Sequence, residues 1–218
     1  ILNNGFFTTE LINFTAEDRL CIPVPFYHCF GMVMGNLGCS SHGATMVIPA
    51  PGFDPETTLR AIADERCTGV YGAICPVDVM KRCIDEMNMT EVAICYGMTE
   101  TSPVSTQTRA DDTLERRTAT IGRVHPHVEI KVVDPVSGET VDRGVTGEFC
   151  TRGYSVMLGY WDDPEKTAEA VDEAADLLEP RAGGAHEPDG PAPHGIGEAE
   201  RHAVEDGGHL VVSDLVAI

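Results

Sequence analysis

Several patterns that mark particular protein classes are missing from this sequence of 218 residues. It contains no run of about 18 apolar residues, so we expect no integral membrane segment. Lysine and arginine are scarce, 15 against 35 aspartates and glutamates, and the net charge is −20. Such a surplus of negative charge argues against nucleic acid or an anionic membrane surface as a partner.

Paired cysteines of the metal-binding kind are also missing. The eight cysteines include no C-x-x-C pair, so we expect no zinc site. Cys21, Cys95 and Cys150 stand in apolar runs, where a thiol behaves as a small hydrophobic side chain. We therefore expect reduced thiols in a cytoplasmic protein, with a disulfide framework as the alternative. Because the chain opens at Ile1 without a methionine or a secretory signal, we expect a fragment of a longer protein.

What the sequence does contain is an alternation of strand-like and helix-like segments over residues 20–95. Such alternation with short connections is typical of an α/β fold with a mostly parallel sheet and flanking helices. Ligands bind beyond the carboxyl ends of such strands, and residues 96–101 would form the loop after the fourth strand. The predicted strands are 20–24, 44–48, 68–72 and 92–95, and the predicted helices are 28–37, one beginning at Pro55, and 76–88.

Two of these helices carry more detailed expectations. Residues 54–56, Asp-Pro-Glu, are typical of a capped helix start. Leu59, Ile62 and Ala63 recur at helical spacing and would form the inner face of that helix. The preceding helix would end near Gly38.

From about residue 120 the pattern changes to that of a small antiparallel β region. HVEIKVVDPVSGETV, residues 127–141, alternates apolar positions and then turns. Beyond residue 173 the chain lacks aromatic residues and is rich in glycine, proline and acid, so we expect a disordered tail. The expected domains are a partial α/β subdomain (1–108), a small β-rich subdomain (109–172) and an acidic Gly/Pro-rich tail (173–218).

One stretch, EVAICYGMTETSPVSTQ at residues 91–107, passes from an apolar run into hydroxyl groups and one carboxylate. A carboxylate beside a polyphosphate is repelled unless a cation lies between them, so Glu100 suits a Mg²⁺ ligand. Thr99 can donate to a phosphate oxygen as charge develops there. The alternative is that Thr99 and Glu100 merely cap the next helix.

Three segments, in this order along the chain, resemble one family. PFYHCFGM (25–32) resembles the aromatic and histidine motif near the acyl pocket of AMP-forming acyl-CoA synthetases, and YGMTETSP (96–103) resembles their adenylate-forming motif. GEFCTRGYSVMLGYWDDPEKTAEA (147–170) is similar to their later Gly-Tyr and Pro-Glu-x-Thr motif. The resemblance, over most of residues 1–172, is to fatty-acid–CoA ligases of the adenylate-forming superfamily. It implies part of their N-terminal domain and a two-step reaction: ATP activates a carboxylic acid to an acyl-adenylate, and coenzyme A then forms the thioester.

The resemblance also implies the roles of individual residues around the nucleotide. Thr99 and Glu100 would be catalytic, and Glu100 would be the Mg²⁺ ligand. Tyr96, Gly97, Met98 and Thr99 would bind ATP, with the Tyr96 ring against the adenine and Gly97 allowing a close backbone approach.

Outside this loop, the resemblance assigns His28 to the substrate site. His28 would line the acyl or adenylate pocket, while its place in an apolar run also fits a core side chain. Tyr160 and Trp161 are interpreted as packing residues. The implied partners are small molecules, namely a fatty acid, ATP and coenzyme A, and the oligomeric state stays open.

The chain also departs from the family pattern. The phosphate loop would lie upstream of Ile1, and the segment between Gly72 and Ile74 lacks a helix, a strand and an adenine-contacting loop. Neither the Thr-Gly-Asp motif nor the C-terminal domain with its lysine follows residue 172. The composition of 173–218 resembles out-of-frame translation of a GC-rich gene. We therefore expect this chain alone to be catalytically incomplete.

Alternative functions remain open at this point. The chain would also fit a non-catalytic nucleotide- or acyl-binding remnant, or an aryl-acid adenylating enzyme. A third alternative is an acidic interaction protein that acts through residues 173–218, which carry ten acidic residues and two arginines.

Overall fold

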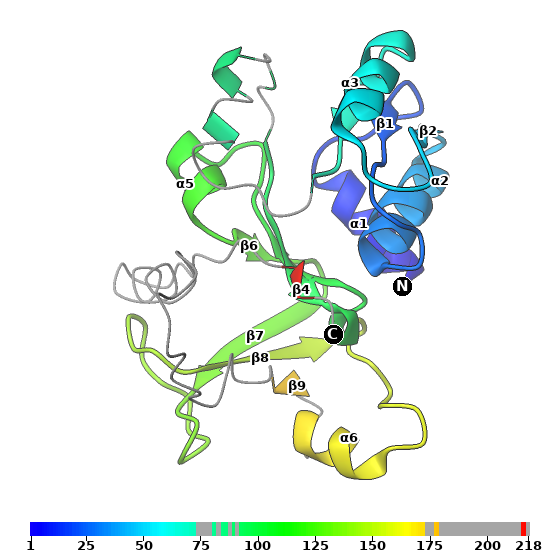
Figure 1. Ribbon diagram of the computed structural model, residues 1–218. Helices are drawn as coiled ribbons and strands as arrows, with labels where there is room; N and C mark the ends of the chain where they lie inside the picture. Colours follow the sequence, from blue (N-terminus) through cyan, green and yellow to red (C-terminus); the bar gives the residue numbers. More distant parts are fainter. Residues whose placement is uncertain are drawn as a thin grey trace, which may run out of the picture.

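The computed structural model describes residues 1–72, 80–81, 84–86, 89, 92–172, 177–178 and 215–216. These residues form three small sheets with helices packed around them. Figure 1 shows the first sheet and its helices in blue and cyan, most of the third sheet in yellow-green, and β4 (Cys95–Met98) of the second sheet between them. The α/β class and the small antiparallel region predicted from the sequence are confirmed.

The first sheet is parallel, as predicted. Its strands β1 (Arg19–Cys21), β2 (Thr45–Val47) and β3 (Gly69–Val70) lie in the order β2-β1-β3. Leu20 and Ile22 are buried at its centre, where they join a core that includes Phe30 and Tyr71. The rings of Phe30 and Tyr71 stack with centroids 5.0 Å apart.

The predicted helix end near Gly38 is wrong. A π-helix, η1 (Phe30–Leu37), runs directly into α2 (Gly38–His42), and the left-handed Gly43 at φ 73° ends the helix. Gly38 is needed for packing instead, because a Cβ there would lie 2.6 Å from the Thr9 side chain of α1 (Leu2–Glu10). The glycine therefore marks a close crossing of two helices, not the end of one.

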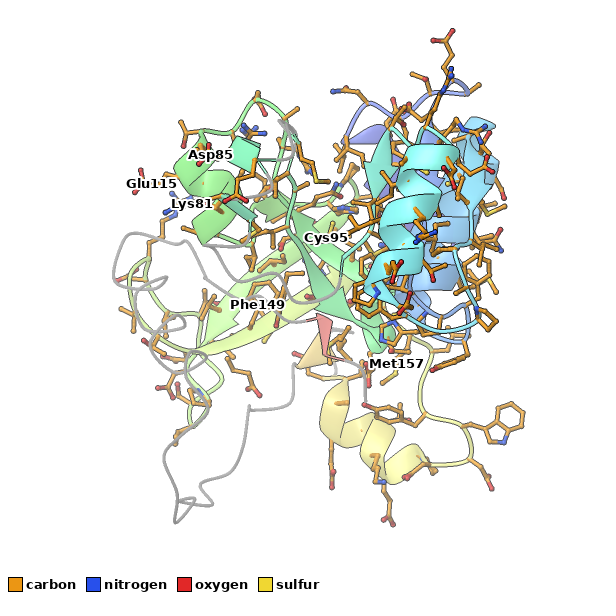
Figure 2. All side chains as sticks on the ribbon, turned by 45° about the horizontal axis from the view of Figure 1, so that its top comes forward. Lys81, Asp85, Cys95, Glu115, Phe149 and Met157 are labelled. Carbon is orange, nitrogen blue, oxygen red and sulfur yellow. The ribbon has the colours of Figure 1, made fainter. Side chains whose placement is uncertain are left out.

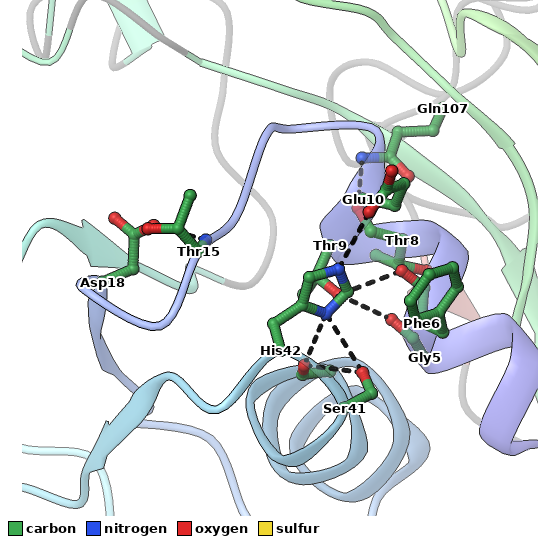
Figure 3. A network of polar contacts seen from close by, with 11 residues as sticks. Gly5, Phe6, Thr8, Thr9, Glu10, Thr15, Asp18, Ser41, His42 and Gln107 are labelled. Carbon is green, nitrogen blue, oxygen red and sulfur yellow. Dashed lines mark hydrogen bonds and ion pairs between the residues drawn. The ribbon is translucent and has the colours of Figure 1, made fainter.

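His42, at the end of α2, contacts three residues of α1 (Figure 3). Its Nε2 lies 3.1 Å from Glu10 Oε2, and its Nδ1 lies 3.0 Å from Thr9 Oγ1. The Phe6 ring stacks on the imidazole with centroids 4.8 Å apart. Four of the α1 residues that face inward are small or polar, so hydrogen bonds as well as apolar contacts hold this helix: Asn4, Gly5, Thr8 and Thr9.

The helix predicted from residue 55 is present as α3 (Pro55–Asp64). Asp54 caps it as expected, accepting the Thr57 N–H at 2.7 Å. Its predicted inner face is wrong at two of three positions: Ile62 is half-buried, but Leu59 is 56% exposed and Ala63 is exposed. Thr58 is buried instead. An apolar stripe is buried only where another element covers it, and none of the described residues covers Leu59.

The fourth strand lies three residues later than predicted and in a different sheet. β4 (Cys95–Met98) pairs antiparallel with β5 (Val104–Gln107), so residues 96–98 belong to a strand and not to a loop. β6 (Arg123–Val124) pairs with β5, and β10 (Leu215–Val216) lies parallel to β4 at the sheet edge. The short link to β5, which contains the 3₁₀ helix η2 (Thr99–Thr101), imposes this antiparallel pairing.

The third sheet is the predicted antiparallel region. β7 (Val128–Val133) pairs with β8 (Glu148–Gly153), which pairs with β9 (Leu177–Leu178). Asp134 holds the predicted turn, since its Oδ1 accepts the backbone N–H groups of Val136 and Ser137. α5 (Leu114–Ala119) precedes the sheet, and α6 (Pro164–Ala170), capped by Asp163, follows β8.

Two predicted segments are described only in part. Within 76–88, residues 80–81 and 84–86 are helical and Met80 is buried. Figure 2 labels Lys81 and Asp85 of this segment, and Glu115 of α5. Most of the predicted tail lies outside the described residues. The division into domains at residues 108 and 172 stays a prediction, and strands from both sides of residue 108 meet in the second sheet. No described helix has the length and apolar character needed to cross a bilayer.

Candidate nucleotide-binding site

The candidate site centres on η2, the turn that joins β4 to β5. Thr101, which is fully buried, shapes this turn: its Oγ1 accepts the Met98 N–H at 3.1 Å and lies 2.6 Å from Pro103 O. A β-bulge at Tyr96 and Gly97 shifts the register just before the turn. In this turn Thr99 is exposed and Glu100 is buried.

Thr99 lies beside the segment that contains His28, although the two are far apart in the sequence. The Thr99 hydroxyl oxygen is 3.9 Å from Cys29 Sγ, and Cys29 Sγ is 3.8 Å from His28 Nδ1. His28 Nδ1 accepts the Phe30 N–H at 3.1 Å, which places the proton of a neutral ring on Nε2. Burial raises the pKa of the Cys29 thiol, so it is protonated at neutral pH. The structure thus brings together two of the three motifs.

Glu100 is 5% exposed, and its two carboxylate oxygens differ. Oε1 accepts a hydrogen bond from the Tyr160 hydroxyl at 2.9 Å, whereas Oε2 is buried and has no hydrogen-bond partner among the described residues. Met157, labelled in Figure 2, donates its backbone N–H to the Glu100 carbonyl at 2.8 Å. Burial and the neighbouring Glu100 carboxylate raise the pKa of Tyr160 to about 12, so its hydroxyl stays a donor.

A magnesium ion fits this arrangement. A buried carboxylate oxygen without a partner costs free energy, and a bound cation removes that cost. Mg²⁺ is usually held by one or two carboxylates together with phosphate oxygens and water. In the part of the chain that the structure describes, no cluster of three histidine, cysteine or acidic side chains could hold a metal. Glu100 would therefore be a single protein ligand to an ion that also binds phosphates.

The other predicted nucleotide-binding residues lie along β4. Tyr96 is half-buried, and its ring meets Phe149 of β8 edge-on with centroids 5.5 Å apart. Met98 is buried. Gly97 is required by the hairpin itself, because a Cβ at this position would lie 1.8 Å from Pro103 O. The need for glycine here thus has a structural cause that is independent of any nucleotide.

Two residues contribute to this site in ways that the sequence did not predict, and a third residue differs from its predicted role. Thr101 shapes the turn, and Tyr160, interpreted as packing, instead donates to Glu100. Trp161, also interpreted as packing, is 98% exposed. The Tyr160 side chain points towards Glu100, and the side chain of Trp161 points to solvent. The resemblance of residues 147–170 to a family motif was a sequence signal that Tyr160 has a role. Sequence spacing alone does not show that this motif contacts the motif at residues 96–103.

Comparisons with known proteins show the family of this chain. The family model described as AMP-binding enzyme matches residues 1–74 and 69–161. The chain belongs to this family. It is 42% identical over 200 residues to a putative acyl-CoA synthetase, YngI, of Bacillus subtilis, covering 78% of this chain and 36% of the relative. It is 40% identical over 202 residues to a mitochondrial medium-chain acyl-CoA ligase, ACSF2, of Danio rerio, covering 78% and 33%.

The solved structures support the fold. The crystal structure of ATP-bound MatB from Rhodopseudomonas palustris superposes with a TM-score of 0.71 at 24% identity, over 81% of this chain and 39% of that one. Among adenylate-forming enzymes the fold of this chain is therefore that of the N-terminal domain. The chain spans about a third of the length of the curated relatives that it matches.

The alignments also bear on the short segment after Gly72. The two family matches meet at residues 69–74, and the alignment to the Bacillus protein is 200 residues long but takes in 78% of this 218-residue chain. The relative therefore has residues opposite a gap in this chain. Both observations agree with the expectation that a helix and a strand of the family pattern are missing from this chain after Gly72.

Proposed function

We propose that this chain is the nucleotide-facing part of an AMP-forming acyl-CoA synthetase. In the complete enzyme, a carboxylate attacks the α-phosphate of ATP and releases pyrophosphate, and the thiol of coenzyme A then attacks the acyl-adenylate and releases AMP. One observation carries the proposal: Glu100 Oε2 is a buried carboxylate oxygen without a partner among the described residues, one position from an exposed threonine hydroxyl. Membership of the AMP-binding enzyme family supports the same site.

The residues take distinct roles in this proposal. Glu100 holds Mg²⁺, which neutralises the charge of the leaving pyrophosphate. Thr99 donates its exposed hydroxyl to an α-phosphate oxygen, where negative charge grows during attack. Tyr96 and the backbone at Gly97 and Met98 border the nucleotide on the β4 side.

His28 lies in the segment assigned to the acyl group, next to the cysteine that contacts Thr99. Its half-buried ring, two residues before the start of η1, is in position to contact the substrate carboxylate or its adenylate. The adjacent Cys29 contacts Thr99, so the acyl and phosphate subsites meet at this point.

The complete reaction needs more of the protein than this chain provides, since it spans about a third of its relatives. We assign the chain nucleotide and magnesium binding, with thioester formation left to the complete enzyme. We also propose a cytoplasmic location, which the free cysteines of the described part support, because thiols stay reduced there.

The direct test is calorimetric titration of the chain with Mg²⁺ and ATP. Saturable binding is expected, and Glu100→Gln should weaken it by roughly tenfold or more, since a lost metal ligand costs at least as much as a lost supporting residue. Glu56→Gln, at an exposed position of α3, removes the same charge and should bind as wild type. Equal binding by Glu100→Gln and wild type would exclude the metal role. In the complete enzyme, pyrophosphate exchange with a panel of aliphatic and aromatic acids separates fatty-acid from aryl-acid activation.

A further inference from the structure

The loop after β8 forms two hydrogen bonds with Glu100. The Met157 N–H binds the Glu100 carbonyl at 2.8 Å, and the Tyr160 hydroxyl binds Glu100 Oε1 at 2.9 Å. These contacts span about 60 positions of sequence and join the third sheet to the turn that carries the candidate site. The side-chain contact leaves only one carboxylate oxygen without a partner among the described residues.

We propose that Tyr160 is a positioning residue, whose hydroxyl fixes the Glu100 carboxylate so that Oε2 alone faces the metal. This inference rests on the proposed function. A carboxylate with two free oxygens can rotate and bind a metal through either or both. A donor on Oε1 removes that freedom and selects a single-oxygen contact, which suits the strict octahedral geometry of Mg²⁺. Partners of this kind orient metal ligands in many sites.

The backbone of Tyr160 is itself held in place by α6. Thr167 Oγ1 accepts the Tyr160 N–H at 2.9 Å and donates to the Asp163 carbonyl at 2.8 Å. Gly159 sits at φ 147°, and a Cβ there would lie 2.9 Å from the Thr167 side chain. The Gly-Tyr pair and the threonine of Pro-Glu-x-Thr thus form one unit. We infer that this unit sets the position of Tyr160, and through it the orientation of Glu100.

A purely structural role for the hydroxyl makes a different prediction. In that case Tyr160 would simply satisfy a buried carboxylate, and its loss would lower stability without changing metal affinity. The two roles are therefore separated by measuring metal binding and unfolding on the same variants.

The experiment titrates the chain with Mn²⁺ in the presence of ATP and follows free Mn²⁺ by electron paramagnetic resonance. Mn²⁺ shares the oxygen-ligand preference of Mg²⁺ and is visible to this method. Tyr160→Phe removes only the hydroxyl and should raise the Mn²⁺ dissociation constant by about 10–100-fold. Tyr154→Phe, which removes a hydroxyl outside this site, should leave it unchanged. Thr167→Val should weaken Mn²⁺ binding, whereas Thr167→Ser, which keeps the hydroxyl, should restore it.

Each outcome has one meaning. If wild type binds Mn²⁺ with ATP, and Tyr160→Phe binds equally well but unfolds at lower urea, the positioning role is excluded and the proposed function stands. If wild type does not bind Mn²⁺ with ATP, the proposed function fails, and this inference fails with it. A Glu100→Gln and Tyr160→Phe double variant should bind no more weakly than Glu100→Gln alone. Additive losses would show that Tyr160 acts on the metal site by another route.

Discussion

Asn4 and Val104 lie 100 residues apart and exchange two hydrogen bonds, as neighbouring strand residues do. Asn4 Nδ2 donates to Val104 O at 2.8 Å, and the Val104 N–H donates to Asn4 Oδ1 at 3.0 Å. The side-chain amide of Asn4, in α1, thus completes the hydrogen bonding of Val104, the first residue of β5 after the η2 turn. This contact connects the helices of the first sheet to the strand behind the candidate site.

Replacing Asn4 by alanine should therefore be costly. Asn4→Ala leaves a buried N–H and a buried carbonyl of Val104 without partners, and we expect a loss of about 2–4 kcal/mol in the free energy of unfolding. Urea denaturation measures it. Asn3→Ala, at an exposed position of the same helix, should change stability by less than about 0.5 kcal/mol. Similar losses for both variants would show that Asn4 matters only through the helix.

The Gly97 position gives a second prediction. In Gly97→Ala the new methyl group would meet Pro103 O at 1.8 Å, which only a shift of the β4–β5 hairpin can relieve. We expect a loss of about 3 kcal/mol or more. Gly52→Ala is the matched control, since a Cβ there has no neighbour within 4 Å. Thermal unfolding of the two variants compares them, and a stable Gly97→Ala protein would contradict the crowding inferred here.

Local sequence signals predicted the parts of this fold that depend on adjacent residues. Asp54 before Pro55 starts a helix, because the cap bonds to a backbone N–H within the same turn. The parallel order of the first sheet likewise followed from strand–helix alternation.

Contacts between distant residues decided what the sequence did not predict. β4 lies three residues later than expected because its partner is β5, and pairing partners are not encoded in the apolar run itself. Tyr160 lies about 60 positions from Glu100, so neither motif by itself shows that the two meet. The exposed Leu59 has the spacing of a buried residue, but burial depends on a neighbouring element that spacing does not reveal.

The buried thiols provide a chemical test of the core. Burial raises the pKa of Cys21 and of Cys39 to about 11, and both side chains are inaccessible in the folded protein. Because the thiolate is the reactive form, neither should be alkylated by iodoacetamide at pH 8. Peptide mass spectrometry should show both residues unmodified in the native protein and modified after urea denaturation. Native alkylation of either one would contradict the packing of the first sheet.

His125 should make the stability of the folded chain depend on pH. Its Nε2–H donates to Gln107 Oε1 at 2.9 Å, and Gln107 Nε2 in turn donates to Thr8 O at 3.0 Å. Burial, with a smaller effect from the positive charge of Arg109, lowers the pKa of His125 from 6.5 to about 3. The folded protein therefore keeps this ring neutral at pH values where the unfolded chain binds a proton.

The sign of the effect follows from that difference. Above about pH 6.5 both states are neutral and the stability is fully present; as the pH falls towards about 3, the unfolded state takes up a proton and stability is lost. Between pH 7 and pH 5 this loss should be about 2 kcal/mol. His125→Gln keeps a donor for Gln107 but does not titrate, so its urea midpoint should fall less over this range than that of wild type. Parallel midpoints for the two proteins would show that His125 is protonated in the fold, which its buried contact with Gln107 opposes.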